Sequence, residues 1–366
     1  MKNTWRAIPE FWRSAILGAV TLAVLAATES ATNLVFALPH GRFPAAMIEI
    51  MRSQAVLENP GVTGYYERLF TETRRLPLVG TAPNRIMDSS FRIVRMKPNL
   101  KGLSNSFGLA GPEYTLYKPP NTRRVALLGD SLTQGLGVAI PSNYCSLLDR
   151  RLNETRSGAN GQRIEIVNFA LAGYQLTQIF DTAVEDVPRF EPDVYALALT
   201  ELSVYRPWDE HIIEVLRMGI DMKYDFLRDT IREAGVGPAD GPLALFGKLA
   251  PYRIRTLWTL LSQMKSLAEA HHATFVVMLV PAVEDGDLTR NRFAGIPELL
   301  KSLGIVTVDV LDTFDGVPDR DALRIYPTDV HPNKRGHEMI FQNLYAKFRA
   351  QPDAWRDLMG PAAEAF

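Results

Sequence analysis

The sequence predicts an α/β protein, a three-layer α/β/α sandwich built on a parallel sheet of about five strands. From Arg124 onward, short apolar runs rich in branched residues recur, and longer segments with helical periodicity lie between them. This alternation is typical of a parallel sheet that helices cover on both faces. The expected strands lie in the runs RVALLGD, IEIVNFALAG, PDVYALALT, ATFVVMLVP and GIVTVDVLD.

Residues 1–30 are expected to form a cytoplasmic tail and a membrane anchor. The run Ser14–Thr28 carries no charge and follows Lys2, Arg6 and Arg13. As a helix it would span about 22 Å, and flanking aromatic and arginine side chains would extend it towards the roughly 30 Å of a hydrocarbon core. A cleaved signal peptide is the alternative. The basic residues before the run predict a single-pass protein of the bacterial inner membrane with its main domain in the periplasm.

The remaining chain divides into three parts. Residues 31–121 lack a strong period and are expected to form a stalk and a covering segment. Residues 122–350 carry the strand–helix pattern, with a helical insertion at about 205–251, where the interval between two strands is too long for a simple crossover. Residues 351–366 are expected to form a C-terminal tail.

Composition excludes several classes of function. Apolar residues make up 46% of the chain and charged residues 22%, with a formal net charge of −1 and no long basic run. A nucleic-acid partner is therefore not expected. The single cysteine, Cys145, excludes an internal disulfide and a cysteine-built metal site. His337 has no further ligands at metal-binding spacing, so neither a metal nor another cofactor is expected.

The glycine-rich segment GDSLTQGLG raises the question of a phosphate loop. Such a loop needs a lysine and then Ser or Thr after its second glycine, whereas Leu136 follows Gly135 here. The spacing of the glycines does not match a dinucleotide fingerprint either. A nucleophile turn that presents Ser131 is the remaining interpretation.

A general base for Ser131 is available near the C-terminus. Asp329 and His331 are two residues apart, so in an extended segment their side chains leave the backbone on the same side. A histidine that a carboxylate orients can take the proton of a serine hydroxyl. Because the carboxyl ends of parallel strands meet at one edge, Ser131, Gly173, Thr200, Asp329 and His331 are all expected at the same rim of the sheet.

The order and spacing of these motifs resemble those of the SGNH/GDSL hydrolases. The matching blocks are GDSLTQGLG, NFALAGYQ and DVHPNKRGH, and the resemblance covers roughly residues 105–349. It implies a flavodoxin-like fold, a catalytic triad of Ser131, His331 and Asp329, and oxyanion-binding amides at Ser131 and Gly173. The segment NSFGLAGPEYTL is similar to that of bacterial envelope members with an N-terminal anchor.

One block departs from the family pattern. The asparagine side chain that completes the oxyanion hole in the family falls on Leu202, which cannot donate a hydrogen bond. The hydroxyls of Ser203 and Thr200 are the possible substitutes, and Glu201 could donate only when protonated. Tyr205 and Trp208 follow the same strand and could line a substrate cleft, although core or lid packing is an equal alternative.

The sequence is compatible with three classes of function. The first is a serine esterase or deacylase that acts on an acylated, for example acetylated, carbohydrate or a lipid ester. The second is an O-acyltransferase that passes the acyl group to an envelope polysaccharide. The third is a non-catalytic polysaccharide-binding or assembly protein. Proteins of a polysaccharide pathway are possible partners, besides the membrane that the N-terminal helix would contact.

Overall fold

The computed structural model describes residues 85–87, 90–154, 162–205, 209–240, 242–326 and 329–360. The predicted cytoplasmic tail and anchor, and residues 31–84, 88 and 89 of the predicted stalk and covering segment, lie outside these residues. Within the described ranges, no helix has the length and apolar character that crossing a membrane requires.

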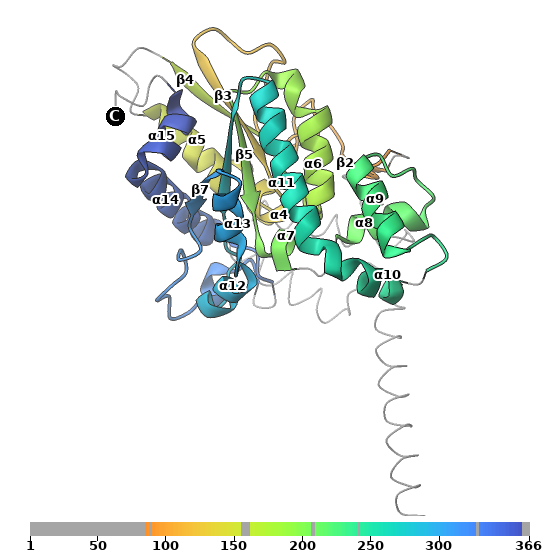
Figure 1. Ribbon diagram of the computed structural model, residues 1–366. Coiled ribbons are helices and arrows are strands. Elements are labelled where there is room, and N and C mark those ends of the chain that lie inside the picture. The colour runs from red at the N-terminus through yellow and green to blue at the C-terminus, as the bar shows by residue number, and fades with distance from the viewer. Residues whose placement is uncertain are drawn as a thin grey trace, which may run out of the picture.

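A five-stranded parallel sheet forms the centre of the molecule, as the sequence predicts (Figure 1). The strand order is β4-β3-β5-β6-β7, and Val125 on β3 is in register with Ile166 on β4 and with Val194 on β5. The strands are β3 (Thr122–Leu128), β4 (Arg163–Asn168), β5 (Val194–Leu199), β6 (Thr274–Leu279) and β7 (Val306–Asp309).

In β3, β4, β5 and β6, alternate residues enter two separate hydrophobic cores. Ala126 and Leu128 face one core, whereas Val125 and Leu127 face the other. The first core is covered by α6 (Leu176–Glu185), α11 (Arg253–Ala270) and α13 (Ile296–Ser302). The second is covered by α5 (Tyr144–Glu154), α14 (Lys334–Ala350) and α15 (Pro352–Met359). Burial on both faces explains why the strands are nearly continuous apolar runs.

Helix α15 corrects the expectation of a C-terminal tail. Its apolar face, which includes Trp355 and Met359, is buried in the same core as α5 and α14. The spacing of Ala354, Trp355, Leu358 and Met359 is that of an amphipathic helix, and this spacing is the sequence signal that distinguishes α15 from a tail. The region up to Met359 therefore belongs to the folded core.

The segment before the sheet contains a small hairpin, and the predicted insertion is helical. The hairpin pairs β1 (Arg85–Met87) with the antiparallel strand β2 (Val94–Met96). The helices that follow β5 are α7 (Glu201–Tyr205), α8 (Glu210–Arg217), α9 (Asp225–Ala234) and α10 (Pro242–Leu249). In Figure 1, α8, α9 and α10 lie together on one side of the sheet, beyond α6 and close to β2.

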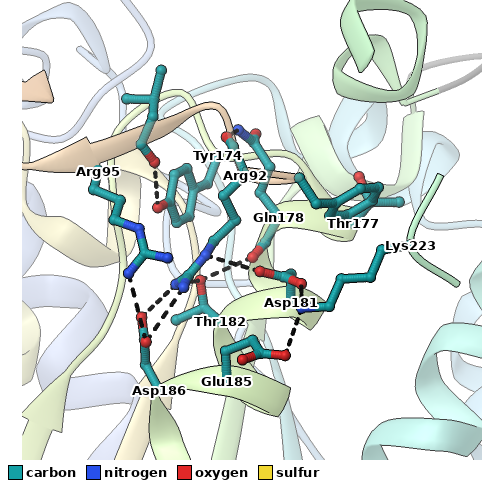
Figure 2. A network of polar contacts seen from close by, with 12 residues as sticks. Arg92, Arg95, Tyr174, Thr177, Gln178, Asp181, Thr182, Glu185, Asp186 and Lys223 are labelled. Atoms are coloured by element: carbon teal, nitrogen blue, oxygen red, sulfur yellow. Dashed lines mark hydrogen bonds and ion pairs between the residues drawn. The ribbon is translucent and has the colours of Figure 1, made fainter. Parts of the chain in front are cut away.

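A cluster of charged side chains, of which Arg92 and Asp181 are buried, joins the covering segment to the rest of the molecule (Figure 2). Arg92 Nε lies 2.9 Å from Asp181 Oδ2, and Arg92 also pairs with Asp186. Lys223 Nζ lies 2.7 Å from Asp181 Oδ1 and 2.5 Å from Glu185 Oε1. These five residues, called the Arg92 cluster below, connect the hairpin region, helix α6 and the segment between α8 and α9.

Candidate active site

Ser131 lies in the sharp turn that joins strand β3 to the short helix α4 (Ser131–Gln134). The Asp130 side chain caps this helix by accepting a hydrogen bond from the Leu132 amide at 3.0 Å. Gly129 leaves no room for a side chain, because a Cβ there would lie 2.4 Å from the Thr133 hydroxyl oxygen. The turn therefore fixes Ser131 at the carboxyl end of the strand.

His331 bridges Ser131 and Asp329. Its Nε2 lies 2.7 Å from Ser131 Oγ, and its Nδ1 is hydrogen-bonded to Asp329 Oδ1. The same carboxylate oxygen accepts a hydrogen bond from the His331 backbone amide at 2.8 Å. The structure thus brings together the three residues that the sequence predicts as a catalytic triad, although Ser131 and His331 are 200 positions apart.

The loop that carries the histidine is fastened to its surroundings by backbone hydrogen bonds. The Val283 amide donates to the Val330 carbonyl at 2.8 Å, and the Ile325 amide donates to the His331 carbonyl at 3.1 Å. Just beyond the loop, the Asn333 side chain caps helix α14. These contacts hold the imidazole in place without help from a substrate.

Asp329 is ionised at neutral pH. Burial acts to raise the pKa of its carboxyl, but hydrogen bonds from His331 and Tyr326 outweigh burial and hold the pKa below its ordinary value. An ionised Asp329 favours the imidazole tautomer with its proton on Nδ1. The Nε2 lone pair is then directed to the Ser131 hydroxyl, which is the arrangement a general base requires.

The backbone amides of Ser131 and Gly173 make no hydrogen bond to another described residue. Gly173 follows strand β4, is exposed, and has a φ of 84°, in the left-handed region that favours glycine. The adjacent Ala172 amide donates to Gln134 Oε1 at 2.8 Å, which fastens this loop to the helix of Ser131. Both amides therefore remain available to a negative oxygen that forms at Ser131.

The two hydroxyls expected as substitutes for the missing asparagine differ in their surroundings. Thr200 is fully buried, and its hydroxyl donates to Asp130 Oδ2. Its proton is committed to the cap of the Ser131 helix, so Thr200 is not placed to donate to an oxyanion. Ser203 lies in α7 and is half-buried, and its hydroxyl makes no hydrogen bond among the described residues.

The other residues predicted near this strand are only partly described. The side chains of Leu202 and Tyr205, and the whole of Trp208, lie outside the described residues. Glu201 accepts a hydrogen bond from the Thr289 hydroxyl at 2.7 Å and lies 3.6 Å from Arg292. Burial raises the pKa of the Glu201 carboxyl to about 7, so this group titrates near neutral pH.

His337 has a packing role in the second core. It is fully buried in α14, and its ring stacks on that of Tyr144 at a centroid distance of 5.9 Å. Burial lowers the pKa of His337 to about 3, so the imidazole is neutral. Across the described ranges of the chain, no group of three or more His, Cys, Asp or Glu side chains could hold a metal ion.

Comparison with known proteins identifies the family of this domain. Residues 127–339, more than half of the chain, match the model of the GDSL-like lipase/acylhydrolase family. A comparison with curated proteins gave no match.

Several solved structures are distantly similar to this chain. TesA is 13% identical, with a TM-score of 0.40, and the match covers 62% of this chain and 99% of TesA. The esterase EstA from Pseudoalteromonas sp. is 13% identical, with a TM-score of 0.40, and the match covers 62% of this chain and 97% of EstA. A mutant of the acetyl-xylooligosaccharide esterase Axe2 from Geobacillus is 16% identical, with a TM-score of 0.41, and the match covers 62% of this chain and 93% of Axe2. None of these likenesses bears on the substrate of this chain.

Proposed function

Because the chain belongs to the GDSL-like lipase/acylhydrolase family, we propose that it is a serine ester hydrolase that forms an acyl-enzyme on Ser131. One observation carries this proposal: the hydrogen-bonded chain from Ser131 through His331 to Asp329. A serine hydroxyl is a weak nucleophile until a neighbouring base takes its proton. His331 is within hydrogen-bonding distance of that proton, and Asp329 stabilises the imidazolium that results.

In the proposed reaction, Ser131 Oγ attacks the ester carbonyl carbon while its proton passes to His331 Nε2. The tetrahedral oxyanion receives hydrogen bonds from the Ser131 and Gly173 amides. The carbon–oxygen bond to the alcohol then breaks, and His331 returns the proton to the leaving oxygen. A water molecule attacks the acyl-enzyme by the same route, which releases the carboxylic acid and restores Ser131.

The proposed substrate is an acylated carbohydrate or a lipid ester outside the cytoplasm. The support is the sequence: an uncharged run at residues 14–28 follows basic residues, and the segment NSFGLAGPEYTL is similar to that of anchored envelope members of the family. An alkaline phosphatase fused after Phe366 is expected to be active in a bacterial host. A fusion that is active only with a cytoplasmic reporter would reverse this orientation.

The acyl-enzyme is tested with the purified protein and a fluorophosphonate probe. We expect one label per chain, located on Ser131 by mass spectrometry, and hydrolysis of p-nitrophenyl acetate. Ser131→Ala is expected to lose the label and about 10⁶-fold in kcat. Ser146→Ala is the matched control, since Ser146 is a half-buried serine of α5 and has no part in the proposed triad or oxyanion hole.

Two results would contradict the proposal. Unchanged ester turnover in Ser131→Ala would assign the activity to another group. Failure of the wild-type protein both to label and to hydrolyse esters, with the fold intact by circular dichroism, would instead support a binding or assembly role.

A further inference from the structure

Arg85, on strand β1 of the hairpin, lies against the loop that carries Gly173. Its Nη2 donates to the Ala172 carbonyl at 2.5 Å, across 87 positions of sequence. A Cβ placed on Gly173 would lie 3.4 Å from Arg85 Nη1 and 3.6 Å from Nη2. The guanidinium therefore lies beside Gly173, whose amide is a proposed oxyanion donor, on the side where a side chain would project.

The loop of Gly173 is held on both sides of this contact. On one side, the Ala172 amide is bonded to Gln134 at the end of the Ser131 helix. On the other side, the Ala172 carbonyl is bonded to Arg85. Two hydrogen bonds of the Ala172 backbone thus connect Arg85 to the helix of Ser131, so the position of the arginine depends on that of the nucleophile.

The hairpin that carries Arg85 is itself anchored. The Tyr174 hydroxyl donates to the Val94 carbonyl on β2 at 2.8 Å, and Val94 is buried. Two residues before this strand, Arg92 enters the buried cluster with Asp181 (Figure 2). A cation on such a support does not need to be ordered when a substrate arrives, which favours its use in stabilising charge.

The chemistry of the site has a place for such a group. The family's asparagine donor falls on Leu202 in this chain, and Thr200 gives its hydroxyl proton to Asp130. A guanidinium provides N–H donors in a planar fork, and its hydrogen bonds to a negative oxygen are charge-assisted and therefore stronger than those of an amide.

We propose that Arg85 is a catalytic residue that donates a hydrogen bond to the oxyanion of the tetrahedral intermediate, in place of the absent asparagine. This inference rests on the proposed ester hydrolase function. The hairpin that precedes the hydrolase domain would then take part in the reaction in addition to covering the domain.

The inference is tested by the hydrolysis of p-nitrophenyl acetate, a neutral ester. Removing one oxyanion donor typically lowers kcat by about 100- to 1000-fold. We therefore expect the kcat of Arg85→Ala to be lower than that of the wild type by a factor in this range, with little change in KM. Arg85→Lys is expected to retain more activity than Arg85→Ala, because the positive charge remains. Arg95→Ala is the control, since Arg95 lies on the same hairpin, has a side chain that is 43% exposed, and is 3.9 Å from Asp186.

Chemical rescue separates a catalytic role from a structural one. Millimolar guanidinium chloride is expected to restore part of the kcat of Arg85→Ala, whereas urea at the same concentration is not. A loss that guanidinium does not restore, accompanied by a lower Tm, would overturn the inference in favour of loop anchoring. An unchanged kcat in Arg85→Ala, while Ser131→Ala is inactive, would overturn it and leave the esterase function standing. Absence of Ser131-dependent turnover in the wild type would instead reject the esterase function itself.

Discussion

The triad and the Arg92 cluster are both sets of ionic and hydrogen-bonding side chains, but they are built in opposite ways. The side chains of His331 and Asp329 are 15% and 14% exposed, and their hydrogen bonds end at the Ser131 hydroxyl. The side chains of Arg92 and Asp181 are only 2% and 3% exposed, and their charges neutralise each other. The first set keeps one reactive group for a substrate, whereas the second uses its charges to join distant segments.

The two regions therefore contribute to different properties: the triad to activity and the Arg92 cluster to stability. A partly exposed triad can lose one member without leaving an unpaired charge deep in the protein. A buried ion pair cannot, because the desolvated partner remains without compensation. Changes in the triad should therefore act mainly on kcat, and changes in the Arg92 cluster mainly on the free energy of unfolding.

The largest effect is expected for Asp329→Asn. The amide cannot stabilise the imidazolium or maintain the tautomer of His331, so kcat for p-nitrophenyl acetate should fall by about 10⁴-fold. The Tm should change by only a few degrees, because Asp329 is near the surface of the rim. A variant that keeps its Tm and more than a tenth of its activity would show that Asp329 does not orient the histidine.

The next effect is expected for Arg92→Met. The substitution removes one member of a buried pair and leaves Asp181 with Lys223 as its remaining ion-pair partner and Tyr224 as a hydrogen-bond donor, so the free energy of unfolding should fall by about 3–5 kcal/mol. Urea titration measures this loss. Arg95→Met is the matched control, and its exposed pair should contribute less than about 1 kcal/mol. Equal losses in the two variants would contradict the role assigned to burial.

Glu201→Gln is expected to change the pH dependence of stability. The folded protein holds the Glu201 proton up to about pH 7, whereas the unfolded chain releases it near the ordinary value of 4.5. The stability that this group provides is complete below pH 4.5 and is lost as the pH rises to 7, a difference of roughly 3 kcal/mol for this shift. Thr289, Arg292 and Glu284 surround the carboxyl.

The measurement is urea unfolding of wild type and Glu201→Gln at pH 5 and pH 8. Between these values the wild type should lose more stability than the variant, because glutamine does not titrate. Parallel losses in the two proteins would mean that Glu201 ionises at its ordinary pKa in the folded state.

The smallest effect is expected for Thr200→Val. The change removes one buried hydrogen bond to the Asp130 carboxyl, so it should lower the free energy of unfolding by about 1.5–3 kcal/mol. Because Asp130 caps the Ser131 helix, a modest loss of kcat should accompany it, smaller than that of Asp329→Asn. A loss of more than 100-fold in kcat with no change in stability would restore Thr200 as an oxyanion donor.

The sequence by itself determined the sheet and the position of the triad residues at its rim. Apolar runs mark strands wherever both faces of a sheet are buried, and each strand ends at the same edge when the connections are helical. Ser131 directly follows such a run, and the spacing of Asp329 and His331 places both side chains on one side of an extended segment. These are local properties, which a pattern of neighbouring residues can express.

Only the tertiary structure decided which distant groups meet. Arg85 reaches Ala172 across 87 positions, and Arg92 reaches Asp186 across 94. Likewise, the hydrogen bond from the Thr200 hydroxyl to the Asp130 carboxylate forms because β5 packs beside β3. A polar residue in the sequence does not specify its partner, since the free energy of a buried hydrogen bond or ion pair depends on geometry and desolvation that arise only when separate segments pack together.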